Sequence, residues 1–215
     1  MSAKSKSTNG LPSVRAHPFP IIVARADWHL WPWFWRSVGV VLLGAGIGVV
    51  AALSRGAGGH SDAIVGVAGR ALNSNDSFSL WFFFRRNTTN AIGALAGLGL
   101  LGLPAIFVLL TTGASIGYGI TVATQAQMPL TIILAALLPH GVVELPGICL
   151  AGACGLTGCH GLRDLAAGRQ VRIAVDWRSL SRSVFAILIL LALAAAIESK
   201  ITAPLLVRLT VPAHS

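Results

Sequence analysis

The stretch LTIILAALLPHGVVELPGICLAGACGLTG, residues 130–158, has two properties that decide the fold of this chain. It is apolar, and it exceeds the roughly 20 helical residues that cross the hydrocarbon core of a bilayer. It also carries an ionisable pair, His140 and Glu144, whose spacing of four places both side chains on one face of a helix. Ionisable groups at hydrocarbon depth are costly unless they have partners, so this pair is the leading candidate for a functional site.

Helix-breaking residues surround this pair. Pro139, Gly141 and Pro146 lie near the middle of the stretch. Proline removes a backbone donor and clashes with the preceding turn, which frees carbonyl groups that neighbouring helices or water must satisfy. We therefore predict a kinked or broken helix near His140. Both a full crossing and a re-entrant segment fit this pattern.

The composition places the whole chain among membrane proteins. Hydrophobic residues make up 54% of the 215 residues and charged residues 11%, and the mean hydropathy is +0.75. Soluble domains have about 25% charged residues, so a water-soluble globule does not fit. The net charge of +9 is typical of the Lys and Arg excess in cytoplasmic loops, and we expect no nucleic-acid interface.

The apolar stretches predict an all-α, polytopic helical membrane protein with about five transmembrane helices. The predicted spans are residues 37–53, 88–109, 112–126, 130–158 and 183–201. They form a single helical membrane domain, residues 37–203. A basic tail with a Trp-rich interfacial belt, residues 1–36, precedes this domain, and a short tail, residues 204–215, follows it. We place the break between the second and third spans at Thr111-Thr112-Gly113.

The basic residues predict the orientation of the chain. With five spans and the N-terminus inside, ten Lys and Arg residues fall in inside segments and six in outside segments. Basic residues accumulate on the cytoplasmic side of inner-membrane proteins. We therefore expect a multi-pass protein of the cytoplasmic membrane with a cytoplasmic N-terminus.

Small residues recur at a spacing of four in four of the predicted spans. Such stripes allow close backbone approach between helices in lipid. The stripes are Gly44 and Gly48, Gly93 and Gly97, Gly113 and Gly117, and Gly147, Ala151 and Gly155. They favour a compact bundle or a homo-oligomer without separating the two. The last stripe continues the face of His140 and Glu144, which should therefore point into protein.

Other polar residues near the spans have simpler interpretations. Asn87 and Asn90 lie at the start of the second span, where they cap the helix or bond across helices. Glu198 marks the headgroup end of the last span. The three cysteines recur at a spacing of five, which rotates each by roughly 140° from the last, so they share no face and are interpreted as packing residues.

Three roles stay open for His140 and Glu144. They form a structural pair that stabilises the kinked helix, or part of a polar pathway or switch, or the centre of an intramembrane hydrolase. A zinc peptidase needs H-E-x-x-H, whereas this helix offers one His and one Glu at the two ligand positions. We predict no catalytic residue, no metal site and no cofactor.

Several of these motifs together resemble one family. They are Phe84-x-x-Asn87, the Gly93 and Gly97 helix, Thr112-Gly113-x-x-x-Gly117, Leu138-Pro139-His140-Gly141-Val142-Val143-Glu144-Leu145-Pro146 and Ala151-Gly152-x-x-Gly155. In this order they resemble the stage II sporulation protein M family, over roughly Phe84 to Gly161. The chain departs from the family pattern at Thr88 and at Thr112, where many members have Asn.

The resemblance implies an integral protein of the cytoplasmic membrane with about five spans. In endospore formers it implies an anchor for peptidoglycan-degrading partners, and other members accompany circular bacteriocin production. We expect a non-enzymatic scaffold or anchor subunit, with cell-envelope remodelling as one setting. The alternative is a transport, export or immunity component with a polar cavity around His140 and Glu144. Expected partners are membrane lipid, other membrane or envelope proteins and further copies of the chain.

Overall fold

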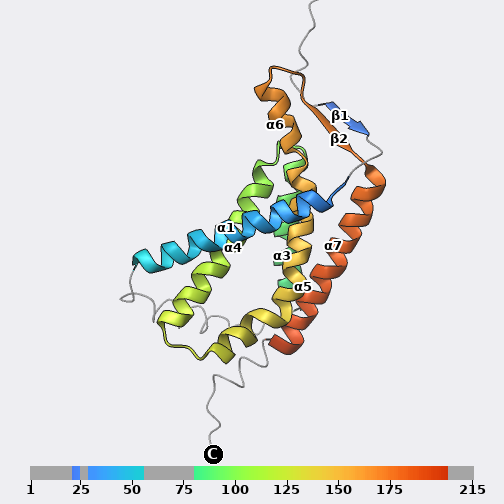
Figure 1. Ribbon diagram of the computed structural model, residues 1–215. Coiled ribbons are helices and arrows are strands. Elements are labelled where there is room, and N and C mark those ends of the chain that lie inside the picture. Colours follow the sequence, from blue (N-terminus) through green and yellow to red (C-terminus); the bar gives the residue numbers. More distant parts are fainter. Residues whose placement is uncertain (1–20, 25–28, 56–79, 203–215) are drawn as a thin grey trace, which may run out of the picture.

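The computed structural model describes residues 21–24, 29–55 and 80–202, so most of the predicted basic tail and the whole C-terminal tail lie outside the described residues. The described part is helical apart from a two-stranded ribbon (Figure 1), which confirms the predicted all-α membrane fold. The elements are β1 (Ile21–Ala24), α1 (Trp31–Arg55), α3 (Leu80–Leu95), η2 (Ala96–Leu98), α4 (Leu103–Gln125), α5 (Leu130–Leu156), α6 (Cys159–Ala166), β2 (Arg172–Val175), α7 (Trp177–Ile197) and η3 (Glu198–Thr202).

Four helical segments in the described part are long and apolar enough to cross a membrane. They are Trp31–Ser54, Leu103–Gln125, Gly141–Ala166 and Trp177–Thr202. The fifth helix, α3, has 16 residues. At a rise of 1.5 Å per residue it is about 24 Å long, which is shorter than the roughly 30 Å hydrocarbon core. The bundle therefore consists of four full-length helices and one short helix.

The predicted break at Thr111-Thr112-Gly113 is wrong, because these residues lie inside α4. Thr111 Oγ1 donates to the Phe107 and Val108 carbonyl oxygens at 2.9 and 3.0 Å, a local bond that lets threonine sit within a helix. The chain turns earlier, through η2 and through Gly102, whose φ of 83° suits glycine. Pro104 then lies in the first turn of α4, where its missing N–H costs nothing.

The predicted kink near His140 is confirmed, and the helix is bent rather than broken. α5 continues from Leu130 to Leu156 with Pro139 and Pro146 inside it. Figure 1 shows its first part (yellow) running across the lower end of the bundle and its second part (orange) running upward beside α7. Proline within a helix is the ordinary cause of such a bend.

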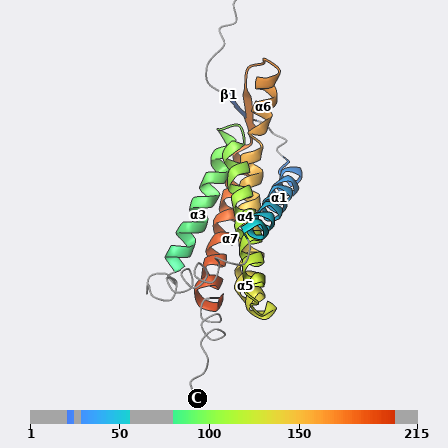
Figure 2. The same cartoon turned by 90° about the vertical axis from the view of Figure 1, so that its left-hand side faces the viewer.

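α1 crosses α4 at close range, inclined to the other helices (Figure 1). A Cβ atom on Gly44 or Gly48 would overlap the α4 backbone at Leu110 or Ala114. A Cβ atom on Gly113 or Gly117 would in turn overlap the α1 backbone. The two predicted stripes thus face each other within one chain. Figure 2 shows α1 on one side of the bundle and α3 on the other, with α4 and α5 between them.

The second half of α5 is the central helix. In its most apolar 18-residue stretch 61% of the residues are buried, against 28% in the corresponding stretch of each of the other three spans. Gly155 packs on the α3 backbone at Ala94, and Gly147 packs on Leu190 and Leu191 of α7. Ile148 of α5 is fully buried, as are Leu109 of α4 and Ile187 of α7. Close packing on three sides holds this half of α5 in place.

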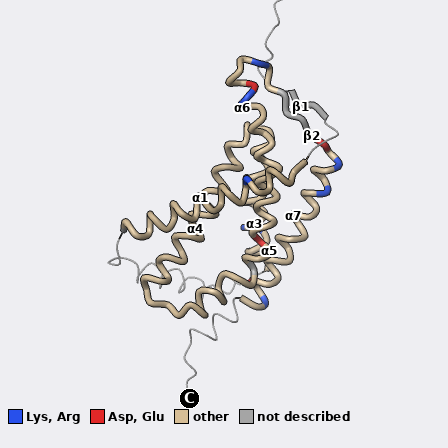
Figure 3. The backbone as a smooth tube through the Cα atoms, viewed as in Figure 1, with Lys and Arg blue, Asp and Glu red and all other residues tan. Residues whose placement is uncertain are grey.

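One end of the bundle collects the basic residues and the strands. β1 pairs with β2 in parallel, with Ile21 opposite Arg172 and Ala24 opposite Val175. Figure 3 shows Lys and Arg segments around α6 and at the start of α7, and further basic and acidic segments midway along the bundle beside α3 and α5. Charged residues inside the bundle are therefore separate from those at its end.

Candidate functional site

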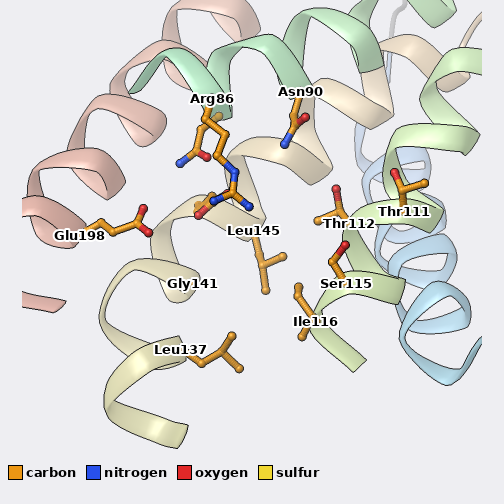
Figure 4. Close-up of a pocket in the computed structure, with 12 residues that line it drawn as sticks. Arg86, Asn90, Thr111, Thr112, Ser115, Ile116, Leu137, Gly141, Leu145 and Glu198 are labelled. Atoms are coloured by element: carbon orange, nitrogen blue, oxygen red, sulfur yellow. The ribbon is translucent and has the colours of Figure 1, made fainter. Parts of the chain in front are cut away.

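A polar cavity of about 390 Å³ lies between α3, α4, α5 and the π-helical turn η3 at the end of α7. Figure 4 shows the residues that line it. They are Arg86, Asn87 and Asn90 of α3, Thr111, Thr112, Ser115 and Ile116 of α4, Leu137, Gly141, Glu144 and Leu145 of α5, and Glu198 of η3. Four elements that are distant in sequence therefore contribute polar groups to one space.

Counted along α4, the cavity lies near the middle of a helix that is long enough to cross the membrane. Thr112 is nine residues after Leu103, where α4 begins, which corresponds to about 14 Å along the helix axis. That is close to half the thickness of the core. Charged side chains at this depth are costly and are normally found facing the interior of a bundle or a water-filled space.

Three charged groups face this space. Arg86 interacts electrostatically with both Glu144 and Glu198, and the two carboxylates also interact with each other. Figure 4 shows the Arg86 and Glu198 side chains directed into the space from α3 and from the end of α7. Arg86 does not approach either carboxylate within 4.0 Å, the limit for an ion pair. The three charges therefore share a cavity without direct ion-pair contact.

Asn87 is the most buried polar residue of the site. Its side chain lies beside the Glu144 carboxylate and the residue is only 4% exposed. Its Nδ2 nevertheless makes no hydrogen bond of ordinary length and angle to any described residue. Buried amide groups in folded proteins nearly always have a protein, water or ligand partner. The Asn87 amide therefore interacts with Glu144 of the neighbouring helix, and its hydrogen bonds are incomplete.

The positions of Asn87 and Asn90 correct the prediction that they cap a helix. α3 already begins at Leu80, so both residues lie in later turns of the helix. The aromatic and basic stretch before them forms the first turns of α3. Both asparagines consequently line the cavity.

α4 contributes a row of hydroxyl groups. Thr111, Thr112 and Ser115 lie on the cavity side of the helix, and Figure 4 shows them opposite Arg86 and Glu198. The sequence contained a signal for this row, because the spacings of three and four place Thr111 and Thr112 on the same face as Ser115. The three residues follow an apolar first part of the helix.

The structure brings only part of the predicted site together. Glu144 and Gly141 line the cavity. His140 lies one turn before Glu144 in α5, but its side chain is outside what the structure describes, so its pairing with Glu144 stays a prediction. Glu198 lies near the end of the last span, as predicted, but it is half-buried and lines the cavity instead of facing the headgroups alone. Arg86 was not expected there either.

The cysteines lie away from the cavity. Cys149 and Cys154 are buried and Cys159 is half-buried, and all three are free thiols. Cys159 lies beside Gly102 in the turn before α4. Among the described residues, no three His, Cys, Asp or Glu side chains are grouped closely enough to hold a metal ion.

A comparison with protein families gives one match. The family described as Stage II sporulation protein M matches residues 37–203. This range contains every residue that lines the cavity. No curated protein and no solved structure matches the chain.

Proposed function

Because this chain belongs to the stage II sporulation protein M family and carries a charged cavity at hydrocarbon depth, we propose that it is a non-enzymatic transport or export component. In this proposal the cavity binds a small polar or ionic solute. The observation that carries the proposal is that Arg86, Glu144 and Glu198 face one space without forming an ion pair.

A purely structural role would call for a different arrangement. A buried charge pair that only stabilises a fold has close contact and satisfied hydrogen bonds, since a loose pair does not recover its desolvation cost. Here the carboxylates and the guanidinium are apart, and the Asn87 amide lies beside Glu144 without a hydrogen bond of ordinary length and angle. Water or a solute in the cavity would satisfy all four groups. Interrupted or bent helices at the bilayer midplane form such sites in known transporters.

The membrane and the orientation belong to the same proposal. We place the chain in the cytoplasmic membrane with its N-terminus inside. The arginines of α6, of the following turn and of the first turns of α7 lie at one end of the bundle (Figure 3), which supports a cytoplasmic location for that end.

Transport is tested by ion flux through the purified full chain in liposomes. Vesicles loaded with a sodium- or potassium-sensitive dye are given an inward gradient of that ion. Vesicles with wild type should show a higher ion flux than empty vesicles, and vesicles with Glu144→Gln should not. Asp164→Asn is the control and should give the wild-type flux, because Asp164 of α6 pairs with Arg169, away from the cavity. Flux equal in wild type and Glu144→Gln would refute transport through this cavity.

A scaffold that assembles partner proteins is the second candidate. Gly39 and Gly46 of α1 have no neighbour within 4 Å of an added Cβ. Gly46 also lies in a shallow apolar hollow with Leu43 and Ile47. Small residues on an outer face allow another transmembrane helix to approach closely. These features support docking of a membrane protein or of a further copy of the chain.

The scaffold is tested by affinity purification from membranes of the native host. Proteins that co-purify with wild type are quantified against those that co-purify with Gly46→Leu and with Glu144→Ala. A stoichiometric partner that is lost with Gly46→Leu while the variant stays folded would support a scaffold. The same set of proteins with all three chains would count against it.

A further inference from the structure

We infer that the α3–α4–α5–η3 cavity is a binding site for a monovalent inorganic cation, sodium or potassium, held by Glu144 and Glu198 together with the hydroxyls of α4. The inference rests on the proposed function in taking the cavity as a solute site. It does not require that the bound ion be transported.

The charge balance of the cavity is the first step. Its lining contains two carboxylates, Glu144 and Glu198, and one guanidinium, Arg86. The sum is one negative charge when all three are ionised. An unbalanced charge at this depth is unfavourable, so it is balanced either by a proton on one carboxylate or by a bound cation. Only a bound cation makes the stability of the protein depend on sodium or potassium, which is what the test below measures. Lys200 does not line the cavity and is exposed.

The donor atoms suit a hard cation. Carboxylate, hydroxyl and amide oxygens are the ligands that alkali and alkaline-earth ions prefer. Glu144, Glu198, Thr112, Ser115 and Asn90 supply such oxygens. Thr111 adds a further one, because its proton is already donated to the Phe107 and Val108 carbonyls, which leaves only lone pairs free.

The Asn87 amide is a second observation that points to an occupant, because it lies beside Glu144 without completing its hydrogen bonds. An amide N–H does not bind a cation directly, but it donates to a water molecule of the hydration shell. Since a water molecule occupies about 30 Å³ of liquid, a cavity of about 390 Å³ has room for an ion with several waters. A partly hydrated ion satisfies Asn87 and the carboxylates at the same time.

The same features favour a monovalent over a divalent ion. The net charge is only one negative, and Arg86 lies in the same space, where it repels a second positive charge. A hydrated ion in a wide cavity is recognised mainly by its charge. We therefore expect sodium and potassium to bind with similar affinity.

The test is the thermal stability of the purified full chain in detergent. Unfolding is followed in sodium or potassium chloride, and in N-methylglucamine chloride at the same ionic strength. Linkage predicts that the Tm of the wild type rises and saturates with either alkali ion, by about 5–10 °C at a hundredfold excess over Kd. N-methylglucamine is too large to enter with its hydration shell and should not reproduce this rise.

Three variants should change the response of Tm to alkali ions in three different ways. Glu198→Gln makes the cavity neutral, so its Tm should no longer respond to the alkali ion. Arg86→Gln makes the cavity doubly negative, so it should respond at lower ion concentration and should also respond to magnesium or calcium. Asp164→Asn removes a carboxylate outside the cavity and should keep the wild-type response. If Glu198→Gln does not fold, Glu198→Asp keeps the charge and should keep the response.

Two results would overturn the cation site. One is a wild-type Tm that is equal in alkali and N-methylglucamine chloride, and the other is an undiminished response in Glu198→Gln. Different results refute the ion site and the transport proposal. A cavity-dependent rise in Tm without flux through liposomes supports a bound structural ion and refutes transport by this chain alone.

Discussion

Replacement of Gly113 by alanine tests the closest contact in the bundle. A Cβ atom at this position would lie 2.9 Å from the Ala45 amide nitrogen and closer still to the Val41 carbonyl oxygen. Both atoms belong to the α1 backbone, so no side-chain rotation relieves the overlap. α1 and α4 would have to separate, and the matching contacts of Gly44, Gly48 and Gly117 would loosen with them.

The expected cost follows from two opposing effects. Overpacking a close contact costs about 1–3 kcal/mol, whereas alanine favours a helix over glycine by up to about 1 kcal/mol. We therefore expect Gly113→Ala to lower the free energy of unfolding by roughly 1–2 kcal/mol. Gly119 is the matched control on the same helix, because nothing lies within 4 Å of its added Cβ. Gly119→Ala should be neutral or slightly stabilising.

The assay is reversible unfolding in mixed micelles with increasing denaturing detergent, followed by circular dichroism. The two variants should differ by roughly 1–3 kcal/mol in free energy of unfolding, with Gly113→Ala the less stable. Equal stability of Gly113→Ala and Gly119→Ala would show that α1 and α4 are not in backbone contact at this point, and the helix arrangement of Figure 1 would have to be revised.

Two further predictions concern the cavity and the start of α7. Ser115→Cys should react with a membrane-impermeant maleimide, because residue 115 lines the cavity. Phe107→Cys is the control and should stay unlabelled in lipid, because Phe107 is exposed on the same helix but does not line the cavity. Equal labelling of the two variants would contradict a water-accessible cavity. Asp176 caps α7, because its side chain accepts a hydrogen bond from the Arg178 amide at 3.0 Å. Asp176→Ala should therefore lower the free energy of unfolding by about 1 kcal/mol in the same micelle assay. An unchanged free energy of unfolding would exclude a stabilising role for this cap.

The membrane fold could be predicted from the sequence because its causes are local. Long apolar stretches, the prolines in residues 130–158 and the motifs of the family are each contained in one segment. The kink of α5 follows from Pro139 and Pro146 alone. The family resemblance is likewise confirmed over residues 37–203.

The turn between α3 and α4 was misplaced because glycine has two uses in lipid. Gly113 was assigned both to a chain break and to a packing stripe, and in the structure it has only the packing role, against α1. Gly97 and Gly102 were the glycines that accompany the turn. Only the partner helix distinguishes the two uses, and a single segment does not contain that information.

The cavity could be predicted only in part, for a similar reason. Glu144 was found because it is a lone carboxylate in an apolar segment. Arg86 and Glu198 lie near the ends of apolar segments, where snorkelling at the headgroups is the ordinary interpretation. The two side chains reach the same cavity because α3 is short and because η3 lies beside it, and both are properties of the assembled bundle.

The bend of α5 and the shortness of α3 together explain why a cavity exists at this level. Leu137 lies before Pro139, and Glu144 lies after it, yet both line the same space, so the cavity lies at the bend itself. α3 begins only six residues before Arg86, so it brings its first charged turns to this level and does not extend far beyond it. A straight α5 beside a full-length α3 would close this space with apolar side chains. The prolines thus shape the polar site as well as the helix, and the charged residues lie where the backbone leaves room for water.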